Sequence, residues 1–160
     1  MSHQKRLMVN EVDPDAYRAI LVMERYVRTG TLDHALLALV RIRASQLNGC
    51  AYCLDMHAVE ARAAGVDQRR LDVLSAWREA PSFFTDREQA ALQLTESVTR
   101  IGEAGVPDSV WEDVTRLFDK NEIVRLLMAT CAINVWNRMA ISTHQALPER
   151  DEAAKAQSPT

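Results

Sequence analysis

Two cysteines and a histidine stand close together in the first half of the chain, as Cys50, Cys53 and His57. On a helix, residues three and four positions apart share one face, so the three side chains can form a single site. His57 would lie about 6 Å along the helix axis from Cys53 and about 10 Å from Cys50. Because helical side chains lean toward the N-terminus, we expect His57 to pair with Cys53, directly or through one water.

The position of the two cysteines at the start of a helix favours redox chemistry. Unpaired backbone N–H groups and the positive end of the helix dipole stabilise a thiolate there, and the thiolate is the reactive form of cysteine. Two thiols three residues apart can also close a disulfide, so a sulfenic acid formed on one can be resolved by the other. The spacing therefore predicts a redox-active dithiol that could reduce peroxides.

Other uses of the same residues remain open. Covalent haem attachment requires a histidine directly after the second cysteine, where this chain has Leu54. Zinc could take the dithiol and His57 as three ligands, with Cys131, His144 or water as the fourth, but no second short-spaced ligand pair follows. The two cysteines could also be simply buried and inert. We expect no metal and no cofactor.

The overall composition suits one globular domain spanning residues 1–160, with 48% hydrophobic and 26% charged residues. The formal net charge of -3 gives no reason to expect nucleic acid or an anionic membrane as a partner. No long uninterrupted apolar segment and no apolar stretch after the N-terminal basic residues are present. We therefore expect a cytoplasmic protein.

Helix signals recur along the chain, and no sustained alternation of the strand type occurs. Asp13-Pro14, Thr85 with Glu88, and Asn121 are predicted helix starts, while Gly49 and Gly65 are predicted stops. The fold class is thus an all-α bundle of about six to seven helices, with a frayed tail after residue 148. The expected helices cover about 14–30, 32–48, 50–65, 67–77, 85–102, 107–118 and 121–145.

The Cys-x-x-Cys-x-x-x-His motif opening a helix, preceded by Arg-Ala-Ser-Gln-Leu-Asn-Gly at 43–49, resembles the alkylhydroperoxidase D-like core of the carboxymuconolactone decarboxylase family. The resemblance is specific over about 32–65, and 74–79, 83–88 and 132–138 look like the small single-domain members. It implies an all-helical subunit that assembles with itself as a homotrimer or homohexamer. In peroxidase members the cysteine pair is reduced by a dithiol partner.

By this resemblance, Cys53 would be the peroxidatic cysteine, Cys50 the resolving cysteine, and His57 part of a proton relay. Peroxidase members carry a glutamate twelve residues before the first cysteine, where this chain has Ala38. Because a methyl group cannot accept a proton, either another carboxylate such as Glu24 or Glu96 approaches the site, or the relay is shorter. Tyr52 also stands where the best-known peroxidase pattern has a histidine.

The leading prediction is a thiol-dependent alkylhydroperoxidase, or a related dithiol oxidoreductase, that acts on a peroxide and is reduced by a dithiol protein or small molecule. The alternative is a non-enzymatic helical oligomer whose dithiol is a redox sensor or a relic. A decarboxylase is less favoured because that reaction needs no dithiol. Elsewhere, Cys131 is expected to be a buried small hydrophobe, and Arg41 and Arg43 are expected on a solvated or interface face.

Overall fold

The fold was obtained as a computed structural model, which describes residues 4–148. It confirms the all-α prediction: within that range the regular structure is helical and no strand occurs. No helix in the same range is long and apolar enough to cross a membrane. The predicted frayed tail lies outside the described residues from residue 149 onward. The α-helices are α1 (Val9–Val12), α2 (Pro14–Arg28), α3 (His34–Asn48), α4 (Ala51–Ala63), α5 (Gln68–Val73), α6 (Asp86–Thr99), α7 (Asp108–Leu117) and α8 (Lys120–Thr143), with 3-10 helices Leu74–Glu79 and Pro81–Phe83.

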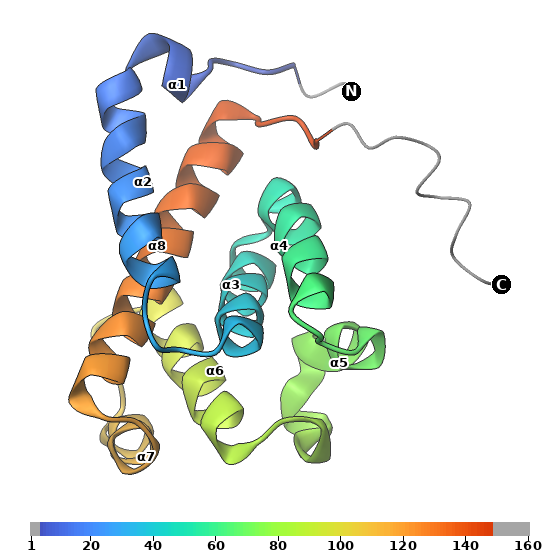
Figure 1. The fold of residues 1–160 in the computed structure, drawn as a ribbon, viewed down its shortest axis with the longest axis vertical. Coiled ribbons are helices and arrows are strands. Elements are labelled where there is room, and N and C mark those ends of the chain that lie inside the picture. Colours follow the sequence, from blue (N-terminus) through green and yellow to red (C-terminus); the bar gives the residue numbers. More distant parts are fainter. Residues whose placement is uncertain (1–3, 149–160) are drawn as a thin grey trace, which may run out of the picture.

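Helix α3 lies at the centre of the bundle, where it packs against α4, α6 and α8 (Figure 1). Its residues from Leu36 to Ile42 are all buried, as an all-round buried helix requires. Helix α2 runs alongside α8. The site motif at the start of α4 is therefore placed between the central helix and the long C-terminal one.

The core consists of three apolar clusters around α3, and the smallest of them contains the dithiol. The larger two fill the space toward α6, α7 and α8 and toward the 3-10 segment. The third joins α3, α4 and α8 through Ala44, Cys50, Cys53 and Ile133. Both cysteines are thus held by core packing rather than by a loop.

Most predicted helix starts are confirmed. The side chain of Asp13 accepts hydrogen bonds from the backbone N–H groups of Asp15 and Ala16. Thr85 and Glu88 satisfy each other's backbone N–H groups in a capping box. The predicted cap at Asn121 is wrong, because Asp119 begins α8 and accepts from the backbone of Glu122.

The expected burial of Cys131 is wrong: its side chain is exposed. The buried face of α8 advances in steps of three or four through Leu126, Ala129, Ile133 and Asn137. Cys131 falls on the opposite side of the helix from these residues. It is therefore separate from the buried dithiol.

Candidate active site

The local sequence places Cys50 at the point where α4 begins. Gly49 ends α3 in the left-handed conformation, with φ of 71°, which a residue without Cβ adopts readily. Cys50 is then the N-cap of α4, and its Sγ accepts the backbone N–H of Cys53 at 3.4 Å. A sulfur thus occupies the position that a serine or aspartate oxygen usually fills.

The two thiols differ in their readiness to ionise. Hydrogen bonding from the Cys53 thiol and backbone, against an opposing effect of burial, lowers the pKa of Cys50 to about 7. Donation to Cys50, burial and the nearby Cys50 charge all raise the pKa of Cys53. Cys50 is therefore the thiol of the pair that ionises first, and the favourable effect of the helix start on the pKa applies to the first cysteine only.

Asn137 of α8 supports the pair from the other side. Its side chain is fully buried, donates to Ser45 Oγ at 3.0 Å, and accepts from Asn48 Nδ2 at 2.8 Å. It also lowers the pKa of each thiol by hydrogen bonding. The end of α3, the start of α4 and α8 are thus joined at the dithiol, a role of Asn137 that no spacing in the sequence indicates.

His57 is buried at 2% exposure and has a carboxylate partner on its own helix. Its Nδ1 lies 2.8 Å from Glu60 Oε2. A carboxylate only accepts, so Nδ1 carries the proton and Nε2 is left as the basic nitrogen. In the described part of the chain Nε2 is buried without a hydrogen-bond partner. An imidazole so oriented can take or return a proton.

Glu60 belongs to a network of charges behind His57. Arg28 contacts Glu60 at 2.6 Å and Glu24 at 2.8 Å, while Arg41 contacts Glu24 at 2.6 Å and Glu60 at 3.8 Å. The hydrogen bond with His57, followed by that with Arg28, lowers the pKa of Glu60 to about 2 against an opposing effect of burial. Glu60 therefore remains ionised at neutral pH.

The carboxylate that contacts His57 is neither of the two that were expected to compensate for Ala38. Ala38 is buried and lines a hollow together with Arg28, Arg41 and Glu60. Of the two predicted substitutes, Glu24 belongs to the network but contacts the arginines. Glu60 is the carboxylate that contacts His57. It stands three residues after His57, and this helical spacing could have indicated the pair from the sequence.

The other predicted substitute, Glu96, lies in a separate network. It accepts hydrogen bonds from Arg43 at 2.7 Å, Trp77 at 2.9 Å and Arg78 at 2.6 Å. These contacts also correct the expectation for the two arginines. Arg41 is only 5% exposed and Arg43 is largely buried, so each lies in an internal ion pair rather than on a solvated face.

Cys53 and His57 line one pocket of about 180 Å³, which we call the aromatic pocket. Tyr17, Tyr52 and Trp136 supply its aromatic walls, and Glu24 and Arg28 lie at its charged side. The pocket brings together two of the three predicted site residues, since Cys50 is not among its lining residues.

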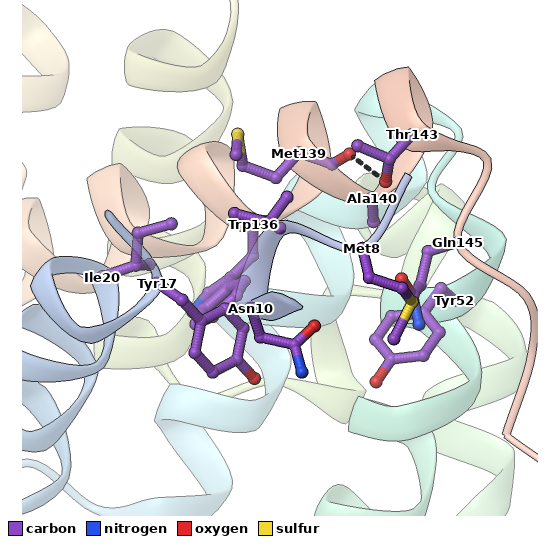
Figure 2. Close-up of a pocket in the computed structure, with 11 residues that line it drawn as sticks. Met8, Asn10, Tyr17, Ile20, Tyr52, Trp136, Met139, Ala140, Thr143 and Gln145 are labelled. Carbon is purple, nitrogen blue, oxygen red and sulfur yellow. Dashed lines mark hydrogen bonds between the residues drawn. The ribbon is translucent and has the colours of Figure 1, made fainter. Parts of the chain in front are cut away.

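A second pocket of about 170 Å³ adjoins the first and shares Tyr17, Tyr52, Trp136 and Ala140 with it (Figure 2). We call it the outer pocket. Its far side is formed by the α1 region, including Met8, and by the end of α8. The rings of Tyr17 and Trp136 meet edge to face, with centroids 5.4 Å apart. The two pockets together offer a largely apolar space to an organic molecule.

The described part of the chain offers no donor set for the zinc alternative. Within residues 4–148, no three side chains among His, Cys, Asp and Glu are grouped so that they could hold a metal ion. Cys131, one of the proposed fourth ligands, is exposed and lines a different hollow with Arg100 and Arg138.

Comparisons with known proteins agree with the helical fold. The uncharacterised protein YdfG of Bacillus subtilis is 36% identical over 138 residues, covering 86% of this chain and 93% of YdfG. A protein of unknown function from Agrobacterium tumefaciens, provisionally described as the antioxidant defence protein AhpD, is 37% identical with a TM-score of 0.87. That match covers 92% of this chain and 100% of the other.

A more distant likeness concerns the fold alone. An uncharacterised peroxidase-related protein from Ralstonia eutropha JMP134, described as an alkylhydroperoxidase AhpD core, has a TM-score of 0.76 at 18% identity. The match covers 88% of this chain and 75% of that protein. Residues 14–97 match the carboxymuconolactone decarboxylase family, and they include Cys50, Cys53 and His57. The chain belongs to the carboxymuconolactone decarboxylase family and has an AhpD-like fold.

Proposed function

We propose that the protein is a thiol-dependent peroxidase that reduces organic hydroperoxides with Cys50 and Cys53. The observation that carries this proposal is that Cys53 and the oriented base His57 line the same largely apolar pocket. A dithiol alone could serve many purposes. Here the dithiol lies near a buried imidazole whose Nε2 has no hydrogen-bond partner in the described part of the chain. Such a nitrogen can accept or donate a proton during a reaction.

The first step oxidises Cys53. Its proton passes to the Cys50 thiolate or to His57 Nε2, and the Cys53 thiolate attacks the terminal oxygen of the hydroperoxide. The O–O bond breaks with its electron pair on the departing oxygen, which takes up a proton and leaves as the alcohol. Cys53 is left as a sulfenic acid.

The second step closes the disulfide. Cys50 Sγ attacks Cys53 Sγ, the S–O bond breaks, and hydroxide leaves as water with the proton from Cys50. A dithiol reductant then returns both sulfurs to thiols and is itself oxidised to a disulfide. The apolar walls formed by Tyr17, Tyr52 and Trp136 support an organic hydroperoxide as the substrate.

The family resemblance and the AhpD descriptions of the related structures support the same chemistry. The alternative of a non-enzymatic redox sensor was based on the absence of a carboxylate at position 38. Glu60 supplies a carboxylate to His57, so this reason for preferring a sensor carries less weight. Self-assembly into trimers or hexamers and a cytoplasmic location remain predictions.

The test is the consumption of cumene hydroperoxide with dithiothreitol as the reductant. We expect turnover by the wild type and a loss of about 100-fold or more in Cys53→Ser, because no sulfenic acid can form at that position. Cys131→Ser is the matched control, since it removes an exposed thiol away from the site. An inactive wild type, or a fully active Cys53→Ser variant, would falsify the proposal. If mass spectrometry showed disulfide formation without turnover, the protein would instead be a sensor.

A further inference from the structure

The two sulfurs of the dithiol line different hollows. Cys53 lines the aromatic pocket with His57, and Cys50 does not. Cys50 lines a hollow of about 390 Å³ on the C-terminal side, and Cys53 does not. We call this second space the C-terminal hollow, which is formed by Gly49, Cys50, Tyr52, Ile141, His144 and Leu147.

Tyr52 separates the two spaces. It directly precedes Cys53 in the chain and, like Ala140, lines both the aromatic pocket and the C-terminal hollow. Each cysteine is only 1% exposed, so a rigid protein surface cannot press directly on either sulfur. A slender molecule that enters a hollow can meet only the sulfur that lines it.

We propose that the oxidant and the reductant reach the dithiol by separate routes: the hydroperoxide through the aromatic pocket to Cys53, and a slender linear dithiol through the C-terminal hollow to Cys50. This proposal rests on the proposed function and names the sulfur at which the disulfide is reduced.

The reduction balances in two exchanges. A thiolate of the reductant attacks Cys50 Sγ, the Cys50–Cys53 bond breaks, and Cys53 leaves as a thiolate that takes up a proton. The second thiolate of the reductant then attacks the reductant's other sulfur, which is bonded to Cys50 in the mixed disulfide. This attack expels the Cys50 thiolate. The reductant leaves as a cyclic disulfide, and two electrons have passed to the protein.

The acidity of Cys50 suits the last of these steps. A thiol with a lower pKa leaves faster in thiol–disulfide exchange. The pKa of Cys50 is lowered to about 7, chiefly by hydrogen bonding from Cys53. In the mixed disulfide Cys50 carries no charge, so one cause of the raised pKa of Cys53 is absent when Cys53 has to leave.

The test narrows each space separately and measures the two half-reactions. Ile141→Trp narrows the C-terminal hollow, and Leu21→Trp narrows the aromatic pocket. Both side chains are about 40% exposed, so the larger ring need not enter the core. Val124→Trp on α8 and Val22→Trp on α2 are matched controls at more exposed positions that line neither space.

The disulfide is prepared with diamide, and its reduction by dithiothreitol is followed in a single turnover. Oxidation of the reduced protein by cumene hydroperoxide is measured separately. We expect Ile141→Trp to slow reduction at least about fivefold while oxidation stays within about twofold, since access limits exchange. Leu21→Trp should show the reverse pattern, and Leu147→Trp should repeat the result of Ile141→Trp from another position in the hollow.

Two results would overturn the separate routes. One is slowing of reduction by Leu21→Trp but not by Ile141→Trp or Leu147→Trp, which would place both reactants in the aromatic pocket. The other is that Ile141→Trp, Leu147→Trp and Leu21→Trp all slow both half-reactions equally, or that none of them slows either half-reaction. Because diamide forms the disulfide without a peroxide, the reduction experiment remains informative even if the protein consumes no hydroperoxide.

Discussion

Glu60→Gln tests the most specific element of the site, the carboxylate on His57. The substitution keeps the size of the side chain and removes its charge. The neutral amide can accept from His57 Nδ1 through its oxygen or donate to it through its nitrogen, so the tautomer of His57 is no longer fixed. We expect kcat/KM for cumene hydroperoxide to fall about 10–100-fold, the usual cost of losing a partner that orients a functional histidine.

The same variant has a calculable effect on stability. A pKa lowered from 4.5 to about 2 corresponds to about 3 kcal/mol. The Glu60 side chain is 30% exposed, and solvent screening reduces this contribution to about 1–2 kcal/mol. The folded state binds this proton more weakly than the unfolded state, so the contribution is complete above pH 4.5 and is lost as the pH falls toward 2. The difference in unfolding free energy between wild type and variant should therefore disappear in strong acid.

The assay needs a control that separates stability from proton transfer. Glu96→Gln removes another half-buried carboxylate with a lowered pKa, held by Arg43 and Arg78 in the separate network. It should also lose stability, because Arg43 and Arg78 lose their charged partner, and it should keep its activity. The tautomer can be read from the ¹⁵N NMR signals of labelled histidine, where wild-type His57 should carry its proton on Nδ1. Full activity in Glu60→Gln, or an equal loss in Glu96→Gln, would refute the role given to Glu60.

Two further predictions concern the dithiol and its support. The rate of alkylation of Cys50 by iodoacetamide should rise with a midpoint near pH 7, and Cys53→Ala should move this midpoint upward because the thiol that donates to Cys50 is removed; an unchanged midpoint would contradict that cause. Asn137→Ala should lower the unfolding free energy, measured in urea, by about 2–3 kcal/mol, because Ser45 and Asn48 lose buried hydrogen-bond partners. A loss below about 0.5 kcal/mol would show that water replaces the amide.

The helices could be predicted from the sequence wherever a local signal was unambiguous. Thr85 with Glu88, and Asp13 before Pro14, mark helix starts with side chains that satisfy specific N–H groups, and both were confirmed. The start of α8 was placed two residues late because Asp119 and Asn121 are both good caps. The glutamate three residues after Asp119 was the deciding signal.

The site was predictable only as far as one helix extends. The helical spacing of Cys50, Cys53 and His57 placed them on one face, and the same rule could have found Glu60. The roles of Arg41 and Asn137 depend on contacts between different helices. Local periodicity carries no information on such contacts. Cys131 was assigned to the core because it stands in an apolar stretch and cysteines are often buried, although the spacing of the buried residues of α8 places it on the opposite face.

The carboxylate on His57 lies on α4, the helix that carries the histidine itself, while the equivalent family position on α3 is occupied by Ala38. The geometry of this acid–imidazole pair is therefore set by the backbone of a single helix. Core substitutions that shift α3 against α4 would change the distance of a pair spanning two helices, but they leave a pair three residues apart intact. Evolution of this chain can thus alter its central packing more freely without losing the orientation of its base.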